Sequence, residues 1–350
     1  MIVVEYQIIK RKDDFCNNKE QFKSLLKTNS NYKISDNIIE YKSLNIKYSL
    51  ENYSIGENQE IMFVIKLSID NETDLNIFEK FDKSFLDFMS KFNDNFSLNV
   101  LWDDISKEYA LKIYPKIFYI ESTLRKIIYF FMSKNVGKDW IKKCFPKDVE
   151  NSINTVKSKN HSENDENILY YADFIQLSYL LFLKYPTEVV SQNDLIQKLK
   201  IKDCNTNELI NKYEFKSNWD RYFEPIINKC DLEDDLNNFY NYRNLVAHNR
   251  KIRNNEKNKF DKLTRKIELV LDKCLEKIDN INVPESEKES VENIGLKIFN
   301  PLKYQTGNKF TTAMDIANIG ATPLFNLEIN PEITAISKAM NSIINKNNAI

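Results

Sequence analysis

Hydrophobic and polar residues alternate over much of residues 1–105, with the two-residue period that is typical of β-strands. Three such runs are rich in Ile, Val, Tyr and Phe, and they cover residues 2–9, 38–55 and 60–69. Between residues 75 and 92 the apolar positions recur at helical spacing, so we expect a helix that covers one face of a sheet. The pattern predicts a β-rich or α+β domain at residues 1–105.

The hydrophobic period lengthens to that of α-helices from residue 106 onwards. Residues 108–141 are expected to form one long helix, with Pro115 at its start, where proline is tolerated, and Gly137 closing it. Asp231 is suited to cap another helix, because acidic residues follow it in the first turn. Further helical segments are expected at 168–184, 192–200, 206–213 and 256–281, with a polar loop at 161–167. Residues 106–283 therefore predict an all-helical bundle, and the chain as a whole predicts an α+β protein.

The two ends of the chain carry weaker patterns. VPESEKES, residues 283–290, is the best candidate for a linker. Residues 284–350 combine a strand- and turn-rich stretch with a final helical one, so we expect a C-terminal extension of mixed structure. The opening residues, MIVVEYQIIKRKDD, have no basic segment before the apolar run and no small-residue cleavage site, and are expected to form a first strand instead of a signal peptide.

Charge and composition argue against several classes of binding site. Basic and acidic residues balance, 50 against 51, so any contact with RNA has to come from a local patch. Only 5 residues are glycine, which argues against a glycine-rich phosphate loop. The five cysteines are scattered without a CxxC pair, which fits reduced thiols. The most apolar stretch, residues 171–185, is too short to span a bilayer, so we expect a cytoplasmic protein with no membrane partner.

One stretch contains several side chains that could take part in catalysis. It is YNYRNLVAHNRKI, residues 240–252, which holds His248, one of only two histidines. Arg243 lies five positions earlier, so on an unbroken helix the two side chains would be about 140° apart. If the helix ends at Ala247 or His248, both side chains can point into one cleft. A guanidinium binds phosphate oxygens as a fork, an imidazole transfers protons near neutral pH, and Asn244 adds an amide. This set suits phosphodiester chemistry.

The segment Arg243–His248, R-N-L-V-A-H, resembles the R-x4-H signature of HEPN domains (higher eukaryotes and prokaryotes nucleotide-binding), with Asn244 as the polar residue that this family favours after the arginine. The earlier IESTLRKII, with Glu121 and Arg125, is similar to the acidic-bearing helix that HEPN domains place across from the motif. The resemblance covers residues 106–283 and makes the bundle an expected HEPN-like domain.

The resemblance implies a homodimer, formed through the helical domain, in which two motifs meet in one composite site and cleave RNA without a metal or other cofactor. The RNA 2′-OH would attack its own phosphate and leave a 2′,3′-cyclic end, which also separates RNA from DNA. His248 would act as general base or acid, and Arg243 would stabilise the charge that builds on the phosphoryl group. Asn244 and Glu121 complete the expected catalytic set, with the Glu121 carboxylate fixing the Arg243 guanidinium.

The resemblance also implies a cellular role. Larger HEPN proteins with added domains resemble effectors of bacterial anti-phage defence or toxin systems, which act by abortive infection. An antitoxin or a phage-derived trigger is therefore an expected partner besides RNA, and residues 1–105 are expected to regulate or sense.

A rim that binds RNA is expected directly after the motif, at Asn249, Arg250, Lys251 and Arg253, although a solvated helix start is an alternative for this stretch. His248 could instead cap helix carbonyls, and Glu121 could form an ordinary helix pair with Arg125. His161 is expected to be a surface residue. The three tryptophans are expected in the core: Trp102, Trp140 and Trp219.

Two other functions are compatible with the sequence. A catalytically silent HEPN module could serve a partner protein through dimerisation or nucleotide binding, and a helical adaptor outside this family could carry the motif by accident. The sequence contains no Walker motif, no HExxH and no DxD-type cluster, so a metal-dependent nuclease is not expected.

Overall fold

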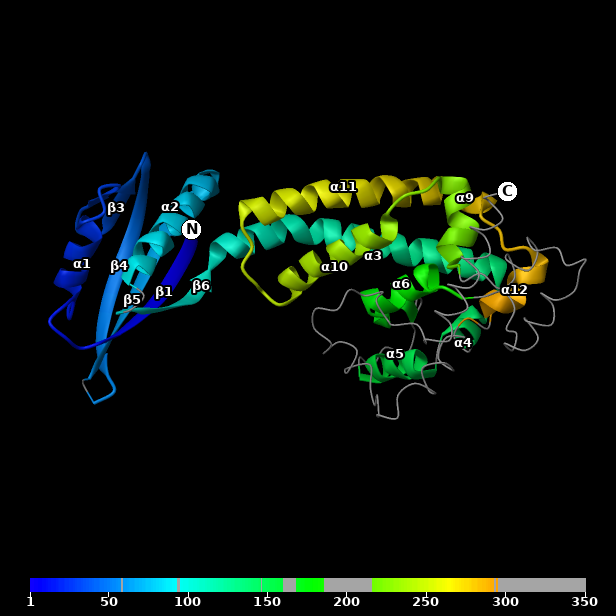
Figure 1. Ribbon diagram of the computed structural model, residues 1–350, viewed down its shortest axis with the longest axis horizontal. Helices are drawn as coiled ribbons and strands as arrows, with labels where there is room; N and C mark the ends of the chain where they lie inside the picture. Colours follow the sequence, from blue (N-terminus) through cyan, green and yellow to red (C-terminus); the bar gives the residue numbers. More distant parts are fainter. Residues whose placement is uncertain are drawn as a thin grey trace, which may run out of the picture. The chain divides into compact units, whose positions relative to one another are not determined.

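The computed structural model describes residues 1–57, 59–92, 95–145, 147–159, 168–185, 216–292 and 294 (Figure 1). The chain divides into two compact units. The first comprises Met1–Ile117 and Asn241–Lys262, and the second comprises Phe118–Tyr240 and Leu263–Ile350. The predicted boundary at residue 105 falls at the start of a long helix, and residues 241–262, which contain the R-x4-H motif, group with the N-terminal residues.

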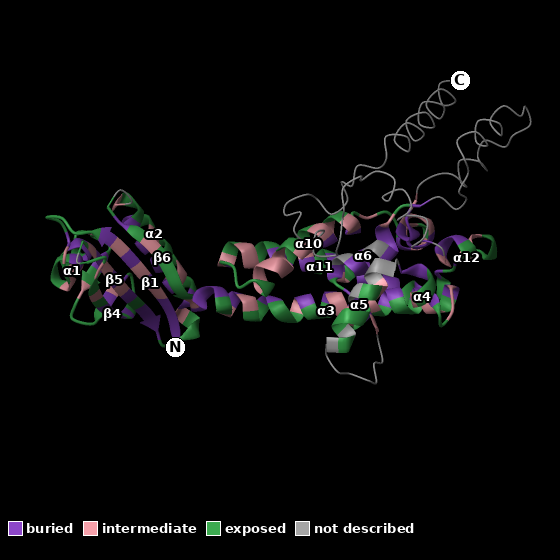
Figure 2. Ribbon diagram, turned by 90° about the horizontal axis from the view of Figure 1, so that it is seen from below, coloured by how far each residue is buried: buried purple, intermediate pink, exposed green. Residues whose placement is uncertain are grey.

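A six-stranded sheet forms the centre of the first unit, in the order β2-β3-β4-β5-β1-β6, and every pairing is antiparallel. Its strands are β1 (Ile2–Arg11), β2 (Tyr32–Ile34), β3 (Ile38–Tyr41), β4 (Leu44–Ile55), β5 (Glu60–Ile69) and β6 (Ser97–Asp103). Buried and half-buried residues alternate along β1, as Figure 2 shows, because successive side chains point to opposite faces. The sheet followed by helices confirms the α+β prediction.

The run that we predicted as one strand at residues 38–55 is two strands joined by a two-residue hairpin loop at Lys42 and Ser43. Helix α1 (Lys19–Lys27) and strands β2 and β6 were not predicted. Helix α2 (Leu75–Met89) was predicted, and it packs against the sheet. The ring centres of Phe85 in α2 and Tyr6 in β1 lie 5.3 Å apart.

Helices make up most of the rest of the described chain. They are η1 (Glu72–Asp74), η2 (Ser90–Phe92), α3 (Asp104–Asn135), α4 (Trp140–Cys144), α5 (Lys147–Lys159), η3 (Ile168–Tyr171), α6 (Phe174–Phe182), the π-helical turn η4 (Trp219–Phe223), α9 (Glu224–Ile227), α10 (Leu232–Ala247), α11 (Asn254–Lys277), η5 (Ile278–Asn280) and α12 (Glu285–Glu292). Aromatic contacts contribute to the core of the second unit: Phe131 lies against Phe223, and Phe174 against Phe239. None of the helices in the described ranges is long and apolar enough to cross a membrane.

Helix α3 differs from its prediction near its start. It begins at Asp104, so Pro115 lies in the helix interior and not at the start, where we placed it. Pro115 has no N–H to donate to the preceding turn, which costs about 3 kcal/mol in a helix interior. Gly137 follows the end of the helix as predicted, with φ of 99° and its N–H donated to the Ser133 carbonyl. That positive φ favours glycine.

The predicted linker at residues 283–290 is wrong, because α12 occupies most of it. Val291 is fully buried, and the Tyr222 hydroxyl donates to Glu287 over 2.7 Å. Pro284 directly before the helix and acidic residues in its first turn favour helix initiation.

The core prediction for the tryptophans holds in two of three cases. Trp140 and Trp219 are buried, whereas Trp102 is 54% exposed. Trp102 lies in β6, an edge strand of the sheet, where one side has no neighbouring strand to cover it.

Several predictions fall outside the described residues. These are the polar loop at 161–167 with His161, the helices at 192–200 and 206–213, and the strand-rich and helical stretches after residue 294.

Candidate functional site

Helix α10 ends at Ala247, directly before His248, as the sequence suggested. The Arg250 N–H donates to the Leu245 carbonyl over 2.9 Å, and the Asn249 N–H donates to the Val246 carbonyl over 3.2 Å. These two bonds are those of the Schellman motif, which satisfies the last carbonyls of a helix. His248 is therefore the residue at the C-terminal cap of α10, followed by a turn of defined shape.

Asn249 gives this turn its shape. Its φ is 50°, in the left-handed region that glycine favours and that asparagine tolerates better than most residues. Its role in the backbone is thus structural, while its exposed side chain stays open to a ligand. The RNA contact of Asn249 stays a prediction.

The motif's side chains differ in exposure. Arg243 and Asn244 are half-buried, and Arg243 Nη1 donates to the Asn244 side-chain oxygen over 3.4 Å. His248, Arg250 and Lys251 are exposed. An exposed imidazole next to two exposed cations can meet a polyanion at the protein surface.

The chain passes from exposed to buried residues directly after Lys251. Ile252 is 2% exposed, and its N–H donates to the Ser106 hydroxyl oxygen over 2.9 Å. The same oxygen accepts from Arg253 Nη1 over 2.7 Å, and the hydroxyl donates to Asp103 over 2.7 Å. Ser106 in α3 thus connects this segment to the end of β6.

Arg253 forms the centre of a buried network. Its guanidinium pairs with Asp103 at 2.8 Å and with Asp82 of α2 at 3.1 Å, and the Tyr6 hydroxyl of β1 donates to the other Asp82 oxygen. The Asp82 side chain is 2% exposed and that of Arg253 is 14% exposed. We call these four residues and Ser106 the arginine clamp.

Protonation in the clamp follows from burial and charge. Burial raises the pKa of Asp82, although the hydrogen bond from Tyr6 and the charge of Arg253 act to lower it. Burial alone would lower the pKa of Arg253, but the charges of Asp103 and Asp82 outweigh it and raise that pKa. Arg253 therefore stays charged, as its two carboxylate partners require.

A neighbouring carboxylate anchors the start of α11. The Asn254 N–H donates to the Glu79 carboxylate over 3.1 Å, and the Tyr109 hydroxyl donates to the same carboxylate over 2.6 Å. The Arg253 N–H donates to Glu256, in the first turn of α11, over 3.2 Å. Both acidic groups satisfy N–H donors that a helix start leaves without intrahelical partners.

The clamp changes our interpretation of Arg253. We expected it to bind RNA together with Arg250 and Lys251, but both of its terminal nitrogens already bond to carboxylates inside the first unit. We therefore assign Arg253 to the scaffold, and the RNA contacts of Arg250 and Lys251 stay predictions.

The sequence position of Asp82 indicates a buried charge that we did not predict. This carboxylate lies on the apolar face of α2, the face that also buries Phe81 and Phe85. A buried charge of this kind requires a partner, so the position of Asp82 in the hydrophobic pattern predicts a cation somewhere in the fold.

Glu121 lies in the second unit. Its side chain is 14% exposed and accepts from Arg125 over 3.0 Å, while Arg125 also donates to the Leu169 carbonyl over 3.1 Å. The helix pair that the sequence allowed is thus formed. Glu121 and Arg243 belong to different compact units, and their expected contact stays a prediction.

The described cysteines, Cys16, Cys144, Cys230 and Cys274, are free thiols. Within the part of the chain that the structure describes, no group of three or more His, Cys, Asp or Glu side chains is placed to hold a metal ion. In comparisons with known proteins, no family model, no curated protein and no solved structure matches this chain.

Proposed function

We propose that this protein is a metal-independent endoribonuclease of the HEPN type. The observation that supports it best is the position of His248: an exposed imidazole at the defined end of a helix, five residues after Arg243 and shortly before two exposed cations. This arrangement offers a proton-transfer group next to groups that attract phosphates.

In the proposed reaction the RNA 2′-oxygen forms a bond to the adjacent phosphorus while the bond from phosphorus to the 5′-oxygen breaks. One imidazole takes the 2′-OH proton, and a second acid gives a proton to the departing 5′-oxygen. Arg243 stabilises the negative charge on the phosphoryl oxygens, and Asn244 orients that guanidinium through their shared hydrogen bond. The products are a 2′,3′-cyclic phosphate and a free 5′-hydroxyl.

A homodimer follows from the need for two proton-transfer groups. Each motif supplies one imidazole, so a second copy of the chain would bring the second. Light scattering tests this: a strict monomer that still cleaves RNA at micromolar concentration contradicts the dimer.

The cleavage experiment uses one RNA and its DNA counterpart, each incubated with the purified protein in EDTA. We expect the RNA alone to be cut, and its new ends to carry cyclic phosphate. An RNA with one 2′-deoxy residue should resist cleavage at that position, because the attacking oxygen is missing. Cleavage of the DNA, or an RNA that stays intact, would contradict the proposal.

The proposed cellular role is that of a cytoplasmic toxin or anti-phage effector, held inactive by an antitoxin or released by a phage-derived trigger. Expression of the active protein should then arrest growth. Within the site, Glu121 is proposed to fix the Arg243 guanidinium. Glu121→Gln should reduce cleavage more than it reduces stability, whereas equal losses in both would favour the simple helix pair with Arg125.

A silent interaction module is the second candidate, and one observation favours it. Helix α3 exposes large apolar side chains at Leu111 and Tyr114, which are 59% and 58% exposed. Exposed apolar side chains at helical spacing suit a protein partner. A stable dimer that cleaves no RNA would favour this function.

A further inference from the structure

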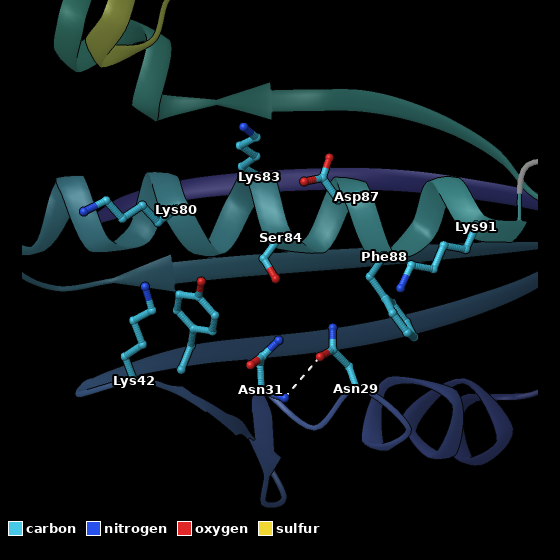
Figure 3. A pocket seen from close by; sticks show the side chains of 10 residues that line it. Asn29, Asn31, Lys42, Lys80, Lys83, Ser84, Asp87, Phe88 and Lys91 are labelled. Atoms are coloured by element: carbon cyan, nitrogen blue, oxygen red, sulfur yellow. Dashed lines mark hydrogen bonds between the residues drawn. The ribbon is translucent and has the colours of Figure 1, made fainter.

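A hollow of about 390 Å³ lies in the first unit, lined by residues of α2, the loop after α1 and the β3–β4 hairpin (Figure 3). Lysines contribute to it from separate segments: Lys42 from the hairpin, Lys80 and Lys83 from α2, and Lys91 from η2. We call it the lysine pocket. Its volume is within the range of small-molecule sites, which begins at roughly 300 Å³.

The pocket's cations lack the carboxylates that accompany other lysines of the sheet. Lys33 pairs with Glu40 and Lys47 pairs with Asp70. In contrast, none of the ion pairs between described residues involves the four pocket lysines, although Asp87 lies four positions from both Lys83 and Lys91 in the sequence. Lysines that line one hollow without an ion-pair partner give it a positive potential, and a bound anion is attracted to it.

In Figure 3 the side chains that line the pocket come from two sides, from α2 and η2 on one and from the loop after α1 and the β3–β4 hairpin on the other. Lys42 and Lys80 lie at one end and Lys91 lies at the other, with the uncharged Ser84 and Asn31 between them. An elongated ligand with negative charge in more than one place fits this order of cation, polar group and cation.

Asp87 is the one carboxylate among the described residues that line the pocket, and its negative charge affects where an anion can bind. In Figure 3 it projects from the same side of α2 as Lys83, away from Asn31 and Ser84. Asp87 therefore reduces the positive charge at that rim, and the other three lysines supply the net positive charge elsewhere.

The backbone at Lys42 adds an independent observation. Its φ is 57°, and it occupies the first position of a two-residue hairpin loop, where glycine or asparagine is favoured. Its ammonium lies 5.2 Å from the ring centre of Tyr41, which is buried and lines the pocket. The hairpin turn thus fixes the backbone position from which the Lys42 side chain lines the pocket.

We propose that the lysine pocket binds a small molecule that carries at least two phosphate groups, such as a nucleoside polyphosphate or a short inorganic polyphosphate. Lysine ammoniums bind phosphate oxygens as point charges, and several of them around one hollow favour a multiply charged ligand over a single phosphate. The proposal goes beyond the proposed ribonuclease activity and does not depend on it.

Isothermal titration of the full chain with ATP, inorganic triphosphate and AMP tests this. The triple variant Lys42→Gln, Lys80→Gln, Lys91→Gln removes three pocket cations. Its matched control, Lys12→Gln, Lys66→Gln, Lys259→Gln, removes three exposed lysines of the same unit that do not line the pocket. We expect triphosphate affinity to fall by about tenfold or more in the pocket variant and to change little in the control.

The relative affinities separate the ligand classes. Tighter binding of ATP than of triphosphate supports a nucleotide, and equal binding supports recognition of the phosphate chain alone. The proposal is overturned if the wild-type chain shows no saturable binding, if AMP binds as tightly as triphosphate, or if both triple variants lose affinity alike. Should the pocket variant unfold at a lower temperature than the wild type, the single variant Lys91→Gln replaces it, and unchanged triphosphate affinity there also overturns the proposal.

Discussion

Residues 248–251 and residues 252–254 are neighbours in the chain but have opposite environments. The first four are all exposed, whereas Ile252 is buried and Arg253 is held by two carboxylates. Arg250 and Arg253 look alike in a sequence, yet one is open to solvent and the other belongs to the scaffold. A run of basic residues is therefore not by itself a binding surface.

The buried half, residues 252–254, holds the backbone of the exposed half, residues 248–251, in place. The arginine clamp fixes the chain just beyond the left-handed turn that ends α10. The exposed half can then carry functional side chains, because a rigid scaffold determines where its backbone lies. The variants below separate the two halves, in order of their expected effect on the free energy of unfolding.

The largest effect is expected from Arg253→Met in the buried half. It leaves Asp82 buried without its cation, and breaking a buried pair in this way costs roughly 3–5 kcal/mol. Arg250→Met is the matched control in the exposed half, and it should change the free energy of unfolding by at most about 0.5 kcal/mol. Urea unfolding measures both variants, and equal effects would refute the division into two halves.

A smaller loss of stability is expected from Asn249→Ala. Alanine in the left-handed region costs roughly 1–2 kcal/mol, whereas Asn249→Gly keeps the turn without that penalty. The glycine variant therefore removes the side chain while it preserves the position of His248. If thermal unfolding shows the two variants to be equally stable, the turn does not depend on the conformation of Asn249.

A third prediction concerns the pH dependence of helix α11, which begins in the buried half. Burial alone would raise the pKa of Asp261, but hydrogen bonds from Lys116 and Lys257 outweigh it and hold that pKa below 3.8. Because the folded-state pKa is the lower one, the stabilisation is present above pH 3.8 and is lost as pH falls through the folded value.

Asp261→Asn should thus be less stable than the wild type near neutral pH, and the difference should shrink in acid below the ordinary pKa of an aspartate. Urea unfolding at a series of pH values measures the difference. Stability curves that run parallel for the two proteins down to low pH would exclude this contribution.

The smallest effect on stability is expected from the pair Arg250→Gln, Lys251→Gln, since both side chains are exposed. Its effect should appear in RNA binding instead. Each lost phosphate contact reduces the slope of log affinity against log salt by about 0.7 for a single strand. Filter binding over a salt series measures the slope, and an unchanged slope would show that this rim does not contact RNA.

The pattern of hydrophobic positions predicted local structure well where one period dominates. It placed β1, β5 and α2, while the polar residues after His248 suggested the end of α10, where an asparagine adopts the left-handed turn. It merged β3 and β4, because Lys42 and Ser43 include no glycine or asparagine to mark the hairpin. It also placed Pro115 at a helix start, because sterics disfavour proline in the interior position that the structure gives it.

The candidate site was predictable only in part. Sequence spacing indicates which residues lie close together along the chain, but not which distant residues meet in the fold. The R-x4-H spacing is local, so the sequence could point to Arg243 and His248 directly. The arginine clamp joins Arg253 to Asp103, 150 positions earlier, and to Asp82, 171 positions earlier, and hydrophobic spacing contains no information on such pairs. Which of the basic residues faces solvent could therefore be learned only from the fold.

The variant His248→Ala tests whether the exposed half provides a catalytic residue. Cleavage of RNA in EDTA is compared among the wild type, His248→Ala and Asn249→Gly, with the fold checked by thermal unfolding and the proposed dimer by light scattering. We predict that His248→Ala folds and assembles normally but cleaves no RNA, while Asn249→Gly, which loses at most one RNA contact, still cleaves. Undiminished cleavage by purified His248→Ala would contradict the proposed role of this imidazole.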